Sequence, residues 1–200
     1  ALKPDLEQWV SEEVGGTVEI GDIYVSMEGR FLQLHADQVL VREPESGQPL
    51  LSFARGALQF DLLRSLRRGE PVTTLFTLTR PKVVITRSAE GHFLVGGVGA
   101  GELEEKEDRY PPLLLGWLLK QPRLKIEDAE LLLHEQQLAA LQWHLTDVNL
   151  DLLNSGYRHQ ANARLLLDGQ QPLEMELEWF GDLLNPQGWD AQMHLKGEGM

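Results

Sequence analysis

Apolar and polar residues alternate along most of the chain. The pattern is clearest in "FLQLHADQVLV", residues 31–41, and "LKIEDAELLLHE", residues 124–135. A period of two places every second side chain on the same side of a β-strand. A short polar break interrupts each run, at Ala36-Asp37 and at Asp128-Ala129. Because Asp-containing breaks between apolar runs are typical of turns, we expect short antiparallel strands joined by tight turns there.

Two segments have a helical pattern instead. In residues 3–14, Leu6, Val10 and Val14 recur every four residues after an early proline, and two glycines follow. This spacing predicts one amphipathic helix that ends by residue 16. Residues 62–68, "LLRSLRR", predict a short helical turn closed by Gly69. Pro81 separates two alternating runs, which indicates a bend or an edge position.

The second half of the chain repeats the order of the first. "FDLLRSL" at residues 60–66 and "LDLLNSG" at 150–156 fall at similar places in each half. Repeated hairpins bury their apolar sides by extending one sheet. We therefore expect a helix over residues 1–16, a first β-meander over 17–97, a mobile acidic loop with a short helix over 98–121, and a second meander over 122–200.

The alternating runs predict rows of apolar side chains across one face of a sheet, and the sequence contains too few helices to cover that face. Two arrangements fit: a sandwich closed on itself, or a groove left open for an apolar ligand. The residues expected in these rows are Leu32, Leu34, Leu58, Phe60, Phe76, Leu78, Val83, Ile85, Leu124, Ile126, Leu141, Trp143, Leu145, Met175, Leu177 and Trp179.

Charge and composition narrow the possible partners. Eighteen basic residues against 31 acidic ones give the 200-residue chain a net charge of −13, which opposes binding to nucleic acid and the close approach of the chain as a whole to an anionic membrane surface. Cysteine is absent, so disulfides are excluded and the compartment stays open. The longest apolar run, residues 111–120, is shorter than the ~20 residues of a membrane-spanning helix. The chain begins at Ala1, so we expect a piece of a longer protein whose membrane anchor lies outside it.

No pattern of catalytic or metal-binding residues stands out. The acidic run at 102–108 lacks the spacing of a calcium loop, and "GGVGAG" at 96–101 precedes acidic residues rather than a phosphate-binding helix. The six histidines include no HExxH pair, and His35 and His134 are expected on polar faces. We expect no enzyme activity, no metal and no cofactor.

The order of the segments resembles that of a known family. The phrases that carry the resemblance are "GGTVEIGDI", "FLQLHADQVLV", "FDLLRSLRRGEP", "LTRPKVVITRSAEGHF", "PRLKIEDAELLLHE" and "WHLTDVNLDLL". In this order, over nearly the whole chain, they are similar to the N-terminal periplasmic region of AsmA-like proteins. The resemblance implies a long, curved antiparallel β-sheet, shaped like a groove and likened to chorein-type lipid conduits, with an N-terminal amphipathic helix and short extra helices.

The resemblance also implies a function. AsmA-like proteins of this type are bridge-like lipid transfer proteins of Gram-negative bacteria, anchored in the inner membrane by an N-terminal helix. Their groove shields phospholipid acyl chains on the way to the outer membrane through the periplasm. In this chain the sixteen row residues would line the groove, and "YPPLLLGWLLK" would either pack in the core or touch lipid through Trp117. The residues of the first helix that would cap the groove are Leu6, Trp9, Val10 and Val14.

Other functions remain open on the residues alone. The same sheet could serve as a closed sandwich that assembles with an envelope protein through its edges, without lipid. A lipid- or glycan-modifying enzyme would need converging polar groups that the sequence does not show. Because exposed apolar rows at a sheet end favour pairing with a second copy, a dimer of this chain is also an expected state.

Overall fold

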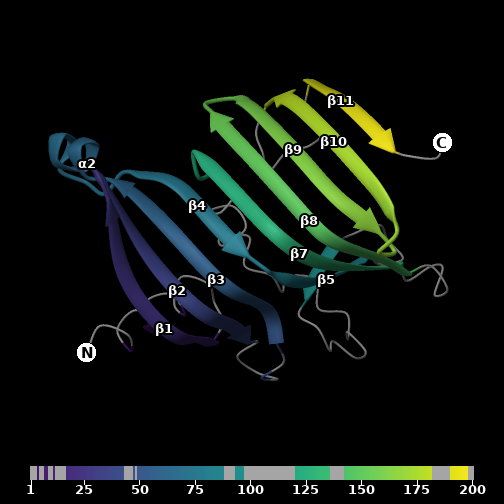
Figure 1. Cartoon of the computed structure of the whole chain (residues 1–200), viewed down its shortest axis with the longest axis horizontal. Helices are drawn as coiled ribbons and strands as arrows, with labels where there is room; N and C mark the ends of the chain where they lie inside the picture. The colour runs from purple at the N-terminus through teal and green to yellow at the C-terminus, as the bar shows by residue number, and fades with distance from the viewer. Residues whose placement is uncertain are drawn as a thin grey trace.

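The structure is a computed structural model in which all the described strands belong to one large curved sheet (Figure 1). It describes residues 4, 7, 8, 11, 17–42, 47, 49–87, 93–96, 120–135, 142–181 and 190–197, without the side chains of residues 50, 84–87, 93–96 and 135. Its elements are β1 Thr17–Glu28, β2 Phe31–Arg42, β3 Pro49–Asp61, α2 Leu62–Arg68, β4 Thr73–Thr79, β5 Lys82–Arg87, β6 Phe93–Gly96, β7 Arg123–Glu135, β8 Gln142–Ser155, β9 Arg158–Leu167, β10 Gln171–Phe180 and β11 Asp190–Gly197.

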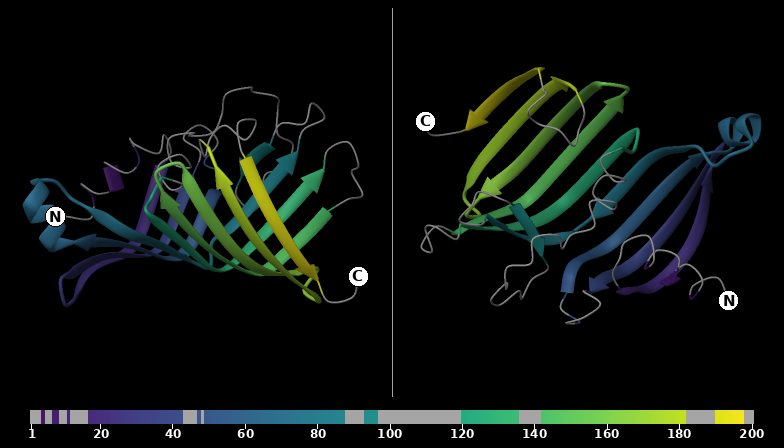
Figure 2. Two further views of the ribbon diagram at one scale, coloured as in Figure 1. Left: turned by 90° about the horizontal axis from the view of Figure 1, so that it is seen from above. Right: turned by 180° about the vertical axis from the view of Figure 1, so that it is seen from behind.

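The sheet has eleven strands in the order β1-β2-β3-β4-β7-β8-β9-β10-β11, with β5 and β6 attached beside β3 and β7. The mainly β class and the single curved sheet confirm the prediction, and Figure 2 shows the curvature from above. The expectation of a purely antiparallel sheet is wrong, because β7 runs parallel to both β4 and β5. Alternation specifies which side chains share a face, but it does not specify strand direction.

Several long strands bend at one level across the sheet. The residues at the bends have left-handed backbone conformations: Gln38 in β2 with φ 53°, Arg80 between β4 and β5 with φ 52°, Asp128 in β7 with φ 54°, and Asp147 in β8 with φ 50°. We call these four residues the crease. Left-handed residues interrupt the strand geometry and increase its local bend. Pro81 follows Arg80 directly, so the predicted bend at this proline is confirmed.

Strand pairing shows that the bends align. Asp37 pairs with Arg55, Arg55 with Thr79, and Thr79 with Glu127. A crease residue follows Asp37, Thr79 and Glu127 in each case, and these three segments run in the same direction. Across the crease, the Arg80 amide donates to the Glu127 carbonyl over 2.7 Å. The strands therefore fold over together along one line.

The crease residue Gln38 explains why position 21 in the neighbouring strand β1 is a glycine. A Cβ added to Gly21 of β1 would lie 2.8 Å from Oε1 and 2.9 Å from Cβ of Gln38. These separations are closer than carbon and oxygen atoms tolerate, so only glycine allows β1 to approach the crease.

The two hairpin turns expected at Ala36-Asp37 and Asp128-Ala129 are wrong. β2 and β7 each continue through the polar break as one strand. In β7 the register shifts between Ile126 and Ala129, which is a β-bulge and not a reversal of direction. A left-handed residue in a bulge and one in a turn favour the same small polar residues, so the local sequence does not distinguish the two.

The crease yields a stability prediction. Replacing Asp128 with valine is expected to lower the free energy of unfolding by about 1–2 kcal/mol, because a β-branched residue tolerates the left-handed region poorly. Replacing Asp128 with glycine or asparagine should cost less. Urea unfolding measures the difference, with Glu127→Val in the extended part of the same strand as the control. If Asp128→Val and Glu127→Val lower the free energy of unfolding equally, the left-handed backbone of Asp128, with φ 54°, is not the cause of the destabilisation.

The predicted short helix at residues 62–68 is confirmed as α2, closed by Gly69 with φ 70°. The Asp61 carboxylate caps its start by accepting from the Arg64 amide over 3.1 Å. The segment at the similar place in the second half, residues 150–156, is not a helix, because Asp151 and Leu152 lie within β8. Asp151 instead pairs with Arg123 on the neighbouring strand, so the similarity between the halves does not extend to this element.

Part of the N-terminal segment lies along the edge of the sheet. Pro4, Glu7, Gln8 and Ser11 are helical. The Glu7 carboxylate accepts from the amide of Ile20 over 2.8 Å, and the Ser11 hydroxyl accepts from the amide of Val18 over 3.0 Å. These two side chains, one helical turn apart, thus satisfy backbone donors of the edge strand β1. Leu6, Trp9, Val10 and Val14 lie outside the described residues, and their capping role stays a prediction.

Candidate functional site

One face of the sheet presents two rows of apolar residues that continue from strand to strand. Residues that pair between neighbouring strands point to the same face. The first row is formed by Val25, Leu34, Leu58, Phe76, Leu124, Leu152, Ala161, Leu177 and Met193, each paired with the next. The second row is formed by Ile23, Ala36, Gly56, Leu78, Ile126, Leu150, Ala163, Met175 and Leu195. We call the surface that carries these rows the apolar face.

Each row crosses nine strands without a polar member. With about 4.8 Å between neighbouring strands, a row extends for about 40 Å along the curve of the sheet. The rows run across the strands, so the apolar surface is continuous from β1 to β11, perpendicular to the strands.

The crease does not reverse the apolar face. Ala129 pairs with Val148, and Ile126 pairs with Leu150 on the other side of the bulge. Val148 and Leu150 lie two residues apart in β8 and therefore share a face. Beyond the crease the face continues through Leu131, which pairs with both Val83 and Leu145.

Burial along the first row falls from the middle of the sheet to its edges. Leu124 and Leu152, in the central strands, are each only 3% exposed, whereas Val25 in β1 is 56% and Met193 in β11 is 62% exposed. The buried centre forms a cluster of Leu124, Leu152, Ala161 and Trp179. Large apolar side chains that remain exposed at both edges are a feature of binding or assembly surfaces.

The opposite face carries charged side chains in cross-strand pairs. The Arg123 guanidinium donates hydrogen bonds to both carboxylate oxygens of Asp151, with Nε donating to Oδ1 over 2.8 Å. Between β5, β7 and β8, Glu130 accepts from Lys82 over 2.9 Å and lies 2.8 Å from the His144 ring. Further pairs join Arg55 to Asp37, Arg158 to Glu178, Arg164 to Glu174 and Arg42 to Glu19. The sheet is therefore apolar on one face and ionic on the other.

The whole chain matches the model of a known protein family. The family model described as "YhdP protein" matches residues 1–200, the whole of the chain. The chain belongs to the YhdP family. The predicted resemblance to AsmA-like proteins is thus confirmed at the level of the family. Searches of curated proteins and of solved structures found no match.

YhdP-family membership makes this a protein of the bacterial envelope. Among the residues that the structure describes, no helix is long and apolar enough to cross a membrane. The family is not known for enzymatic activity. The part of the chain described by the structure also contains no group of three acidic or histidine side chains arranged to hold a metal ion.

Pairing places the predicted row residues of this YhdP-family chain on the apolar face where the structure describes them. Leu32 pairs with Phe60, and Leu133 pairs with both Ile85 and Trp143. The side chain of Ile85, and Leu141 as a whole, lie outside the described residues. The row members that were not predicted are Val25, Leu152, Ala161 and Met193 in the first row and Ile23, Ala36, Gly56, Leu150, Ala163 and Leu195 in the second. Their signal is the same alternation, weakened in β9 by two small alanines.

On the apolar face, the side chain of Trp179 packs against the polar ring of His159. It packs 5.1 Å from the buried His159 ring. His159 Nδ1 lies 2.7 Å from Asn154 Oδ1, and Nε2 lies 3.0 Å from the Gly181 carbonyl oxygen. Each ring nitrogen thus lies within hydrogen-bonding distance of an oxygen of the fold, which gives this histidine a structural role. His35 stacks on Tyr24 and bonds to Ser26 on the opposite face, as predicted. His134 is half-buried and pairs with Gln142.

A shallow depression of about 460 Å³ crosses four strands of the second half. It takes three consecutive residues from each of β7, β8, β9 and β10, so its lining mixes charged and apolar groups. Its charged members include Asp151 and Arg164, which are already engaged in ion pairs with Arg123 and Glu174. The depression offers no arrangement of nucleophile and base.

The ionic face predicts a dependence of stability on pH. Hydrogen bonds from Arg123 lower the pKa of Asp151, and those from Lys82 and then His144 lower the pKa of Glu130. A carboxylate with a lowered pKa stabilises the fold fully above its unfolded pKa, about 4, and loses this contribution as the pH falls through its folded value. The free energy of unfolding should therefore decrease below about pH 4.

Replacing Arg123 with glutamine is expected to reduce this acid-dependent loss, because the substitution removes the largest cause that lowers the pKa of Asp151 in the folded chain. Urea unfolding at pH 3 and pH 7 measures the difference. Arg68→Gln is the control, since Arg68 forms no ion pair with another residue that the structure describes. The prediction is wrong if all three proteins lose the same stability between the two pH values.

Proposed function

We propose that this chain is a periplasmic segment of a bridge-like lipid transfer protein that shields phospholipid acyl chains on its apolar face during transport between the inner and outer membranes. The observation that carries the proposal is the pair of unbroken apolar rows, each crossing nine strands. Membership in the YhdP family is consistent with lipid transport and supports it.

The energetics favour such a surface. Exposing acyl chains to water costs about 0.8 kcal/mol for each CH₂ group, so a lipid with two long tails crosses an aqueous gap slowly without cover. Rows of leucine, isoleucine, phenylalanine and methionine replace water around the tails along the direction of movement. The ionic face remains in contact with water. No covalent chemistry is required, and the chain acts as a conduit and not as an enzyme.

Selectivity among acyl chains should be low. Dispersion contacts with aliphatic side chains have no preferred direction and depend little on the exact tail. In the full-length protein, an N-terminal anchor outside this chain would hold the segment at the inner membrane, with the periplasm of a Gram-negative bacterium as its location. The residues that line the path are those of the two rows together with Leu32, Phe60, Val83, Trp143, Leu145 and Trp179.

A second candidate is an assembly module for envelope biogenesis. The exposed Met193 and Leu195 on the edge strand β11 favour it, since such an edge accepts a further strand from another segment or an envelope protein. The closed two-sheet sandwich is not formed by the described strands, which belong to a single sheet. An assembly module would depend on the edge strands and not on the rows in the centre.

Native mass spectrometry of the purified chain separates the two candidates. We expect phospholipid to co-purify in near-stoichiometric amounts, and extraction followed by lipid mass spectrometry identifies its class. An apo mass that stays unchanged after phospholipid is added would refute the conduit and favour the assembly module.

A further inference from the structure

The helix α2 forms a projection with exposed leucines and arginines. It leaves the end of β3 and extends away from the sheet (Figure 1). None of its residues is buried, and Leu63 and Leu66 are 56% and 83% exposed. Leucines so exposed on a helix need an explanation, because a helix normally turns its apolar side to the protein.

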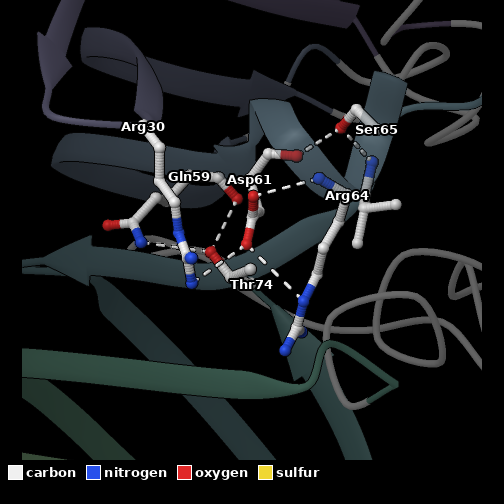
Figure 3. A network of polar contacts seen from close by, with 7 residues as sticks. Arg30, Gln59, Asp61, Arg64, Ser65 and Thr74 are labelled. Carbon is white, nitrogen blue, oxygen red and sulfur yellow. Dashed lines mark hydrogen bonds and ion pairs between the residues drawn. The ribbon is translucent and has the colours of Figure 1, made fainter. Parts of the chain in front are cut away.

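The projection is held firmly in place (Figure 3). The Ser65 hydroxyl donates to the Asp61 carbonyl over 2.7 Å and accepts from the Val72 amide over 2.9 Å. The Leu62 amide donates to the Arg30 carbonyl over 3.1 Å. The buried Asp61 carboxylate caps the helix and lies 3.4 Å from the Arg30 guanidinium. These bonds fix which side of α2 points to the sheet.

Ser65 marks the side of α2 that faces the sheet, and the outer side has two stripes. Successive residues of an α-helix are about 100° apart around its axis. Leu62, Leu66 and Leu63 therefore form one stripe, and Arg67, Arg64 and Arg68 form the next. The leucines and the arginines both point away from the sheet, next to each other.

The charge of α2 is opposite to that of the chain. The helix contains three arginines and no acidic residue, whereas the whole chain has a net charge of −13. Arg67 and Arg68 form no ion pair with any other described residue. Arginines in the last turn stabilise a helix through its dipole, but this effect does not account for the exposed leucines beside them.

We propose that α2 docks this end of the sheet onto an anionic phospholipid bilayer. The leucine stripe would enter the boundary between headgroups and acyl chains, while the arginines extend to the lipid phosphates. Charge complementarity selects this partner, because a basic stripe on an acidic protein orients that protein towards a negative lipid surface. The proposal rests on α2 alone and does not require lipid on the apolar face.

A single fluorescent label tests the contact. The chain has no cysteine, so Leu66→Cys provides a unique thiol for a polarity-sensitive dye. Mixing with vesicles of phosphatidylcholine and phosphatidylglycerol at low salt should shift its emission to the blue, while vesicles of pure phosphatidylcholine should not. The control is Gln170→Cys, which is exposed in the turn between β9 and β10. No shift at Leu66→Cys, or an equal shift at Gln170→Cys, overturns the proposal.

Unlabelled variants supply a second test by vesicle flotation. Exchanging both Arg67 and Arg68 for glutamine should lower the partition coefficient onto anionic vesicles about thirtyfold, since each basic residue near such a surface contributes about 1 kcal/mol. Exchanging Leu63 and Leu66 for serine should also reduce it. Both sites are exposed, so circular dichroism should show an unchanged fold. Vesicle binding equal to that of the original chain overturns the proposal, whereas phospholipid co-purification should persist in both variants.

Discussion

A Trp143→Asp variant is expected to lose its co-purifying phospholipid almost completely. Trp143 lies on the apolar face opposite Leu133 and is 47% exposed. Because it is half-exposed, an aspartate there can be accommodated in the folded chain. An ionised carboxylate placed against acyl chains is costly, since an apolar environment offers it no compensating hydrogen bond. We expect at least a tenfold reduction in bound lipid, about 1.4 kcal/mol, measured by native mass spectrometry.

The neighbouring residue provides a matched control. Gln142 is exposed and points to the opposite face of β8, so Gln142→Asp adds the same charge outside the lipid path. Leu34→Asp in β2 and Ile126→Asp in the central strand β7 test the two rows in the same way, with Lys125→Asp as the control in β7. A folded Ile126→Asp protein that still captures phospholipid would remove Ile126 from the lining. Equal losses in Trp143→Asp and Gln142→Asp would show that the effect is not specific to the apolar face.

The largest effect on stability is expected at Trp179. This side chain is 4% exposed and belongs to the cluster of Leu124, Leu152 and Ala161. Replacing it with alanine should lower the free energy of unfolding by about 3–5 kcal/mol, because the change removes buried contacts and leaves a cavity beside His159. Urea unfolding followed by circular dichroism measures the loss.

Trp143→Ala is the control with the same change of residue. Its side chain is half-exposed, so much less burial is lost, and we expect less than half of the destabilisation. If Trp143→Ala lowers the free energy of unfolding as much as Trp179→Ala does, the buried centre of the sheet is not the main source of stability. The comparison also separates residues that maintain the fold from residues available to a ligand.

The sequence alone predicts the faces of the sheet well, because alternation is a direct consequence of strand geometry. Leu34, Leu58, Phe76 and Leu124 were expected on one face, and pairing joins them in a single row. α2 was also predictable, since Gly69 closes the segment of residues 62–68 and marks the end of the helix. These features depend on residues close in sequence.

The features that could not be predicted depend on contacts between distant segments. The aspartate in "IEDAE" is compatible with both a turn and a bulge, and only the partner strands decide between them. The parallel pairing of β7 with β4 depends on how the chain crosses the sheet, which alternation does not encode. The bonds from Glu7 and Ser11 to the edge strand β1 likewise join two separate segments, and the helical pattern of residues 3–14 gave no sign of them.

The bonds from Glu7 and Ser11 make the two edges of the sheet chemically unequal. The amides of Val18 and Ile20 are occupied, so a strand arriving at this part of β1 would have to displace them. β11 has no such cover from the described residues, and its Met193 and Leu195 extend both apolar rows to the very edge. We therefore expect a further strand to pair more readily with β11 than with this part of β1, and such a strand would lengthen the apolar track without changing its width.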